Sequence, residues 1–117
     1  EVRQQVIAVV ESQFTAFRDG DYARAYSHAA AGIQQQLSLG AFERMVKDGF
    51  PVIAYWRTVS FGEMKDNGQV AVLLVAVQGR RGQARFFRYE LTREMDTWRI
   101  SSVIEVRVSP AVQGQIA

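Results

Sequence analysis

An Asn-Gly pair at Asn67–Gly68 is the feature that most constrains the fold of this chain. A type I′ turn needs positive φ at two successive residues, which makes Asn-Gly the strongest short signal for a β-hairpin. The pair lies between two stretches of strand-like composition, residues 55–65 and 69–78. From Val70 to Val77 the second stretch is apolar without polar alternation, which predicts a strand covered on both faces. A buried helix is the alternative, but the β-branched residues and the flanking turns favour the strand.

Two further strands are predicted over residues 83–93 and 98–106, with turns at residues 80–82 and 94–97. Side chains alternate between the two faces of a strand, so the sequence of each strand predicts which side chains share a face. In the third strand one face is expected to carry Phe87, Tyr89 and Leu91, and the other Phe86, Arg88, Glu90 and Thr92. In the fourth strand one face is expected to carry Trp98, Ile100, Ser102 and Ile104, and the other Arg99, Ser101, Val103 and Glu105.

Helices are predicted before the sheet. The first spans residues 2–18, because apolar residues recur there at helical spacing: Ile7, Val10, Phe14 and Phe17. Gly20 is suited to end this helix and Asp21 to cap the next, over residues 22–30. One helical turn is expected over residues 33–37 and a longer helix over residues 41–48. Phe50-Pro51 is expected to lead directly into the sheet, since a residue before proline avoids the α region.

This order of elements predicts the fold class. Helices followed by an antiparallel meander indicate an α+β domain, with N-terminal helices packed on one face of a curved four-stranded antiparallel sheet. A curved sheet that wraps a helix layer leaves a concavity between the two. We expect one domain over residues 1–108 and a poorly ordered C-terminal tail over residues 109–117, which contains Pro110 and Gly114.

The composition excludes several classes of function. With no cysteine among 117 residues, thiol catalysis, thiolate metal sites and disulfides are excluded. A net charge of +2 predicts no nucleic-acid partner, and no apolar run approaches the roughly 20 residues of a membrane span. The chain begins at Glu1 rather than methionine. We therefore expect an exported protein, periplasmic or secreted, with its leader removed, and a cytoplasmic location stays open.

Several segments resemble a known superfamily, the nuclear transport factor 2-like or cystatin-like proteins. The first is the run from Ile7 to Asp21, with its Ala16-Phe17-Arg18-x-Gly20-Asp21 turn, and another is Trp98-Arg99-Ile100. Within the superfamily the chain is most similar to a bacterial family known as domain of unknown function 4864. The matching segments are Ala31-Gly32-Ile33-Gln34, Phe42…Met45-Val46-x-x-Gly49-Phe50-Pro51, Phe61-Gly62-Glu63 and Tyr89-Glu90-Leu91.

The resemblance implies a conical α+β fold with a pocket between helices and sheet. It also implies frequent dimerisation through the sheet and frequent export in bacteria. Enzymes of the superfamily, such as ketosteroid isomerase and the polyketide cyclases, use an Asp or Glu base in the pocket and a Tyr or Asp donor to the oxyanion. No acidic residue of this chain matches the position of that base, and Glu63 lies at the far end of its strand.

The candidate pocket residues are mostly aromatic. We expect an apolar ligand pocket lined by Phe17, Tyr26, His28, Tyr55, Tyr89 and Trp98, and the competing interpretation is that the aromatic residues simply form the core. His28 is the only histidine and is a candidate general base, or otherwise a partly solvated residue at a helix end. A single histidine without cysteine makes a zinc or non-haem iron site improbable, so no metal, cofactor or catalytic residue is assigned.

The face of the third strand that carries Phe86, Arg88 and Glu90 is a candidate interface, and its charged pair could also lie inside a pocket. The alternative is that Arg88 and Glu90 form cross-strand ion pairs on a solvated face. Three hypotheses follow. The first is a non-enzymatic module that binds a small apolar molecule or a protein, the second an isomerase or cyclase that uses the cavity, and the third a homodimeric interaction protein that acts through the sheet face.

Overall fold

The structure is a computed structural model that describes residues 1–107. Five helices come first: α1 (Val2–Arg18), α2 (Tyr22–Ser27), α3 (Ala31–Gln36), α4 (Leu39–Gly49) and α5 (Pro51–Ala54). Four strands follow: β1 (Trp56–Asp66), β2 (Val70–Gly79), β3 (Ala84–Glu94) and β4 (Thr97–Val106). They form one antiparallel sheet in the order β1-β2-β3-β4. The predicted α+β architecture is confirmed.

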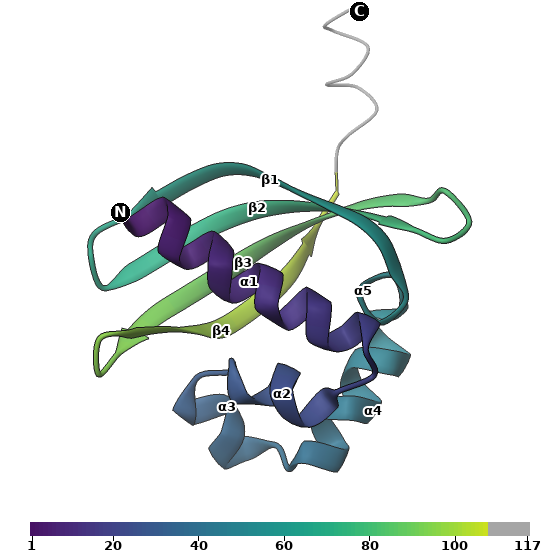
Figure 1. The fold of residues 1–117 in the computed structure, drawn as a ribbon, viewed down its shortest axis with the longest axis horizontal. Coiled ribbons are helices and arrows are strands. Elements are labelled where there is room, and N and C mark those ends of the chain that lie inside the picture. Colours follow the sequence, from purple (N-terminus) through teal and green to yellow (C-terminus); the bar gives the residue numbers. More distant parts are fainter. Residues whose placement is uncertain (108–117) are drawn as a thin grey trace, which may run out of the picture.

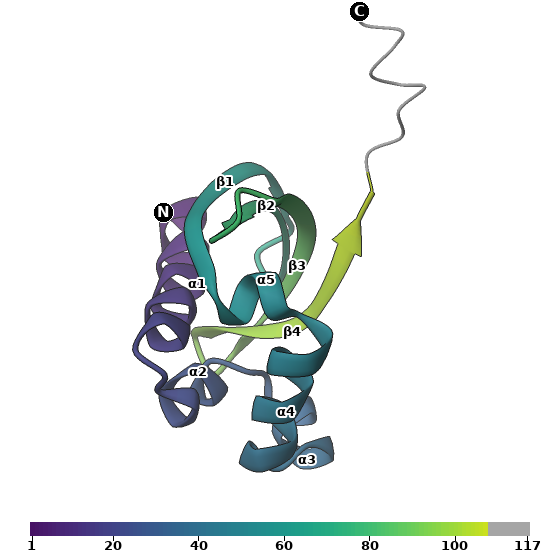
Figure 2. The same ribbon diagram turned by 90° about the vertical axis from the view of Figure 1, so that its right-hand side faces the viewer.

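The helices cover one face of the sheet. In Figure 1, α1 runs across the sheet while α2, α3 and α4 cluster beyond β4, and Figure 2 shows the opposite face without a helix. The buried residues of α1 recur at helical spacing: Val6, Val10, Gln13, Phe14, Ala16 and Phe17. The predicted stripe is confirmed except that Val6, rather than Ile7, is fully buried. The indole Nε1 of Trp56 donates to the Phe14 carbonyl oxygen at 2.7 Å and so fixes β1 against α1.

The hairpin between β1 and β2 is present, but its turn is not of type I′. Only Gly68 has positive φ there, and the Asn67 side chain instead accepts hydrogen bonds from the backbone N–H groups of Gln69 and Val70. Positive φ at two successive residues, as type I′ requires, occurs at Met95 and Asp96 between β3 and β4. The Asn side chain therefore closes the first hairpin in place of the predicted backbone geometry.

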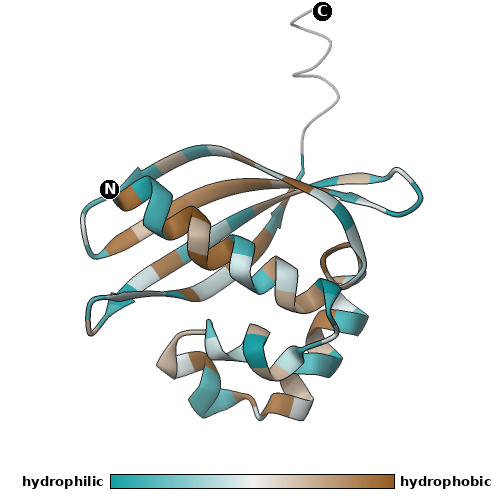
Figure 3. Cartoon of the chain, in the orientation of Figure 1, coloured by the Kyte–Doolittle hydropathy of each residue, from teal (hydrophilic) through white to brown (hydrophobic). Residues whose placement is uncertain are grey.

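The prediction that β2 is covered on both faces is wrong. Ala71, Leu73, Val75 and Val77 are buried, whereas the alternate residues Val70 and Leu74 are 37% and 42% exposed. Figure 3 shows β2 as hydrophobic along most of its length, so its composition does not reveal which face is covered. In this chain the helix layer covers only the inner face, and the outer face of β2 remains apolar and exposed.

The alternation predicted for β4 is interrupted by a β-bulge. Leu91 pairs with Ile100 while the preceding Glu90 pairs with Ser102, so Ser101 is an extra residue in β4. Beyond the bulge, Val103 pairs with the inward-facing Tyr89, and Ile104 is 48% exposed on the outer face. The prediction that Ser102 and Ile104 share a face with Trp98 and Ile100 is therefore wrong beyond Ser101.

Helix boundaries also differ from those predicted. The second helix ends at Ser27 because the next residues pair with β4: the Ile100 N–H donates to the His28 carbonyl oxygen, and the Ala30 N–H donates to that of Ile100. Phe50-Pro51 does not lead directly into the sheet, because Pro51 begins the short helix α5. No helix within residues 1–107 is long and apolar enough to cross a bilayer. The predicted tail, residues 109–117, lies outside the described residues.

Candidate functional site

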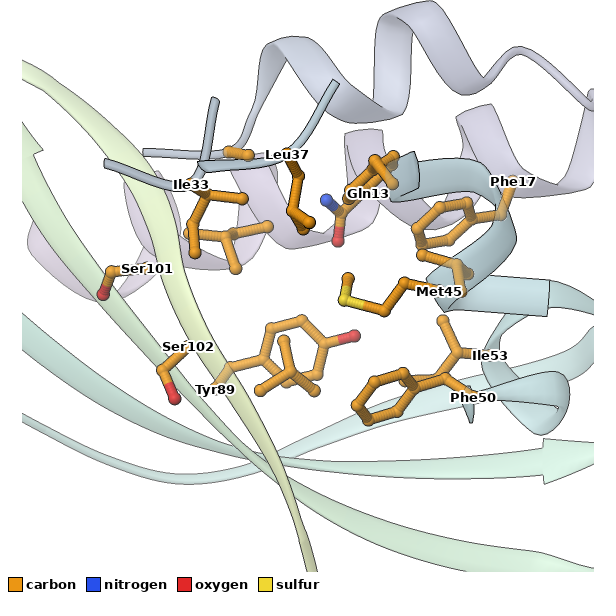
Figure 4. Close-up of a pocket in the computed structure, with 15 residues that line it drawn as sticks. Gln13, Phe17, Ile33, Leu37, Met45, Phe50, Ile53, Tyr89, Ser101 and Ser102 are labelled. Carbon is orange, nitrogen blue, oxygen red and sulfur yellow. The ribbon is translucent and has the colours of Figure 1, made fainter. Parts of the chain in front are cut away.

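A cavity of about 270 Å³ lies between the helices and the inner face of β3 and β4. Its buried floor is formed by residues of six elements or their connections: Gln13, Phe17, Ala29, Phe42, Val46, Ile53, Tyr89 and Ile100. Its mouth is formed by residues that are half-buried or exposed: Ile33, Leu37, Met45, Phe50, Ser101, Ser102 and Val103. Figure 4 shows these side chains converging from α1, α3, α4 and the sheet.

The bulge in β4 contributes one wall of the cavity. It brings Ser101, Ser102 and Val103 to the lining, where an uninterrupted strand would alternate between the two faces. The Ser101 hydroxyl donates to the Glu90 carbonyl oxygen at 3.1 Å, so this side chain already has a partner in the strand. The wall thus carries two small polar side chains, Ser101 and Ser102, and the apolar Val103 at the mouth.

Gln13 is the one polar residue of the buried α1 stripe, and it is 4% exposed. Its Nε2 donates to the Ala25 carbonyl oxygen at 3.1 Å, which ties α1 to α2. Figure 4 shows the Gln13 side-chain oxygen turned toward the cavity. The Gln13 amide therefore joins α1 to α2 through its Nε2, while its Oε1 faces the cavity as a hydrogen-bond acceptor.

Tyr89 projects from the middle of β3 and is 1% exposed. Its hydroxyl points into the cavity (Figure 4), and no hydrogen bond joins that hydroxyl to any of the described residues. Burial raises the pKa of Tyr89 far above its usual value, so the phenol stays neutral and keeps its proton. The hydroxyl can act as donor or acceptor for a group in the cavity.

Among residues 1–107, none of those that line the cavity carries a charge. An ionised ligand would lose its hydration here without gaining an opposite charge, which is strongly unfavourable. Among the described residues, the lining supplies no carboxylate and no histidine, the side chains that most often act in general acid–base catalysis. The geometry suits reversible binding of an uncharged, largely apolar molecule.

Tyr26 lies behind the cavity wall and holds it in place. Its hydroxyl reaches the carbonyl oxygens of Gln34 and Leu37 at the C-terminal end of α3. The Gln34 Nε2 in turn donates to the carbonyl oxygens of Tyr26 and Ala29, at 3.0 and 3.1 Å. The short helix α3 has no fully buried residue of its own, so these bonds position the Ile33 and Leu37 side chains at the mouth.

The chain with this helix layer, meander and cavity also matches a known protein family. Residues 1–112 match the family described as a domain of unknown function, DUF4864. The chain belongs to this family. No curated protein matches the sequence.

Solved structures similar to this DUF4864 domain show the nuclear transport factor 2-like fold. An NTF-2 like protein of unknown function from Shewanella oneidensis has a TM-score of 0.68 at 12% identity, and the match covers 90% of this chain and 98% of that one. A SEC-C motif containing protein from Rhodopseudomonas palustris has a TM-score of 0.67 at 13% identity, over 86% of this chain and 77% of that one. The likeness to the NTF-2 like protein confirms the predicted fold.

Two of the six predicted pocket residues, Phe17 and Tyr89, line the cavity of the DUF4864 domain. Tyr26, His28, Tyr55 and Trp98 do not line it. Trp98 is 3% exposed and precedes the bulge, and its indole Nε1 donates to Gln5 Oε1 at 3.3 Å. It therefore packs under the N-terminal half of α1, away from the cavity.

His28 and Tyr55 lie in shallow grooves elsewhere on the surface. His28 is half-buried in a groove with Glu11 and Arg24, where burial and then the Arg99 and Arg24 charges lower its pKa. Tyr55 is 45% exposed in another groove, where Arg80 lies 5.7 Å from its ring centroid. Neither side chain belongs to the cavity lining.

The predicted interface residues Phe86, Arg88 and Glu90 lie on the outer face, on the side of the sheet opposite the cavity. Neither Arg88 nor Glu90 takes part in an ion pair within residues 1–107. The cross-strand ion pair considered as the alternative is therefore absent from the described part of this chain. The cavity and this outer face therefore lie on opposite sides of β3.

Sequence reasoning missed several cavity residues, and only one had a usable signal. Gln13 falls three residues after Val10 and four before Phe17, which places a polar side chain on the buried stripe of α1. Its position alone marks it as a buried group that needs a partner. The contribution of residues 101–103 depends on the bulge, and alternation in the sequence gives no sign of it.

We expect the same substitution to have different effects at the two tyrosines. Tyr89→Phe removes a buried hydroxyl without a partner, so the free energy of unfolding should stay unchanged or rise. Tyr26→Phe removes the hydrogen bond to the end of α3 and should lower the free energy of unfolding by about 1 kcal/mol. Urea unfolding of both variants measures the difference. An equal loss in both would mean that the Tyr89 hydroxyl has a partner in the folded protein.

The pKa of His28 should lie below its usual 6.5 in the folded protein. The unfolded chain then binds the imidazole proton more readily than the folded protein does. The contribution of His28 to the free energy of unfolding is therefore complete above pH 6.5. That contribution should be lost as the pH falls through the folded-state pKa. NMR titration of the imidazole measures the shift, and urea midpoints of His28→Gln against pH isolate its effect. A folded-state pKa above 6.5 would contradict the expectation.

Proposed function

We propose that this protein binds a small, uncharged, largely apolar molecule in the cavity between its helices and sheet. The observation that supports the proposal most directly is an apolar cavity of about 270 Å³ with no charged residue in its described lining. Protein interiors are normally packed with few voids larger than a water molecule. A cavity of this size and polarity is therefore a reasonable binding site.

An energetic argument supports occupation. At about 24 cal/mol per Å³, a closed and empty cavity of this volume would cost roughly 6 kcal/mol. The stability of a whole domain is about 5–15 kcal/mol. The mouth at Met45 and Val103 admits solvent and reduces that cost, but water gains little among apolar walls. An apolar ligand would restore the missing contacts.

The isomerase or cyclase alternative has less support. Enzymes of that type need a base in the pocket. The only ionisable group in the described lining is the Tyr89 phenol, whose raised pKa keeps it protonated, so no phenolate is available to accept a proton. The lone histidine, His28, lies in a separate groove on the helix surface. Tyr89 by itself could polarise a carbonyl group but could not remove a proton from carbon.

We also propose that the outer face of the sheet pairs two copies of the chain. Four large apolar side chains there are exposed, Val70, Leu74, Phe86 and Ile104, at 37%, 42%, 43% and 48%. Arg88 lies in register between Leu74 and Ile104, and Glu90 is two residues away on the same face. A two-fold contact is self-complementary, so Arg88 of one copy can lie against Glu90 of the other. An exposed apolar face that also carries opposite charges, Arg88 and Glu90, favours such a contact.

For the cavity, we expect Val103→Trp to abolish binding of 2-methylnaphthalene, because the indole would fill the space. Ile104→Trp is the matched control, since the adjacent side chain lies on the opposite face and should leave binding unchanged. Amide NMR shifts at residues 33, 37 and 101–103 during titration report on the site. Failure of 2-methylnaphthalene to shift these signals in the parent protein, or equal binding by the Val103→Trp variant, would count against the cavity as a binding site.

For the outer face, we expect the parent protein to sediment as a dimer and Leu74→Lys to sediment as a monomer. A lysine there would place a charge in the centre of the contact. Leu39→Lys is the matched control, because Leu39 is 39% exposed on α4, away from the sheet. Sedimentation velocity over a dilution series measures the state of all three. A parent protein that stays monomeric at the highest concentration would refute the dimer.

A further inference from the structure

The cavity floor holds two polar atoms without a partner in the described chain, the Tyr89 hydroxyl and Gln13 Oε1 (Figure 4). We propose that these two atoms form a head-group site for one uncharged group that both donates and accepts a hydrogen bond. The ligand class is a small, otherwise apolar alcohol, phenol or carboxamide. This inference rests on the proposed function and adds the chemistry by which the cavity would choose its ligand.

The orientation of the Gln13 amide is fixed by its other contact. Only Nε2 can donate to the Ala25 carbonyl oxygen at 3.1 Å, because a flipped amide would place two acceptor oxygens against each other. The remaining oxygen of the amide therefore faces the cavity, and it can only accept. A ligand that matches Gln13 must bring a hydrogen-bond donor to the cavity floor.

The Tyr89 hydroxyl has the complementary capacity. Its ring packs 6.1 Å from that of Phe14, centroid to centroid, so the phenol is held rigidly within the core. The Tyr89 hydroxyl borders the space of the cavity, and no group of the described chain bonds to it, so it is available to a molecule in the cavity. The phenol stays protonated, because burial raises its pKa, so it can donate to an acceptor atom of the ligand. One hydroxyl or carboxamide group on the ligand satisfies both Tyr89 and Gln13.

The competing ligand classes fit less well. An ionised carboxylate, phosphate or amine would find no opposite charge in the described lining. A hydrocarbon would leave both floor atoms without a partner, which lowers affinity. Of the two serines at the rim, Ser101 already donates to the Glu90 carbonyl oxygen, and Ser102 lies at the half-buried mouth and not on the buried floor.

The volume sets the size of the ligand. A closed cavity of about 150 Å³ takes benzene, and this one is about 270 Å³. Two fused aromatic rings, or an alkyl chain of similar volume, therefore suit the space. Met45 is 39% exposed at the mouth and has a flexible side chain, so it can adjust to the far end of the molecule.

Three molecules of one shape test the inference: 2-naphthol, 2-methylnaphthalene and 2-naphthoate. They differ in carrying a neutral hydroxyl, no polar group, or a charged carboxylate. Calorimetry at neutral pH should show 2-naphthol binding about tenfold more tightly than either of the others. Tyr89→Phe should remove most of this preference and leave the affinity for 2-methylnaphthalene unchanged or higher. Tyr55→Phe, the same change in a separate surface groove, should leave all three affinities unchanged.

The outcomes separate the inference from the proposed function. Equal affinities for 2-naphthol and 2-methylnaphthalene would overturn the head-group site and keep the apolar cavity as a binding site. Tightest binding of 2-naphthoate would overturn the uncharged ligand class. Binding of none of the three would overturn the head-group site and the proposed function together. Gln13→Leu is a second variant that should also remove the preference, and Tyr89→Phe keeps the test valid if loss of the Ala25 bond unfolds it.

Discussion

The apolar stripe of α1 packs against a sheet that has a helix layer on one face only, and the other features of the molecule depend on this contact. Val10 and Phe14 are fully buried at the seam between the layers, and Trp56 bonds to the Phe14 carbonyl oxygen from β1. Because α1 crosses a curved sheet, the remaining helices cover the rest of the inner face less closely. The cavity lies where α3 and α4 complete that layer.

One strand serves both surfaces of the sheet. Tyr89 projects from β3 toward the helices, and its neighbours Arg88 and Glu90 project toward the outside. A change in the backbone of β3 at this point would therefore alter both the cavity and the outer face of the sheet. The side chains on each face can change independently. The interior surface is uncharged and apolar, while the exterior surface combines apolar residues with opposite charges. Such a division suits a protein that binds a small molecule within each copy and pairs copies through the sheet.

Much of the fold could be predicted because it follows from local rules. Helical spacing located α1, and alternation in β3 separated Tyr89 from Arg88 correctly. The hydropathy of β2 led to the wrong prediction that both of its faces are covered, because apolar residues occupy the exposed face as well as the buried one. The cavity was harder to predict than the fold, since its walls come from α1, α3, α4 and β4, and their separation is set by packing rather than by sequence pattern. Four of the six predicted aromatic and histidine residues lie outside it for that reason.

The bulge at Ser101 has a consequence for how related chains could vary. Ile100 and Val103 both face inward, and with Ser101 removed only Ser102 would separate them, so the strand would alternate regularly. Loss of this one codon would leave every later residue of β4 opposite its present partner in β3. Ser101 is thus not required for the pairing of β3 with β4. Its presence instead changes the width of the cavity wall. Deletion of Ser101 would therefore keep the pairing of β3 with β4 and remove one residue from the cavity wall.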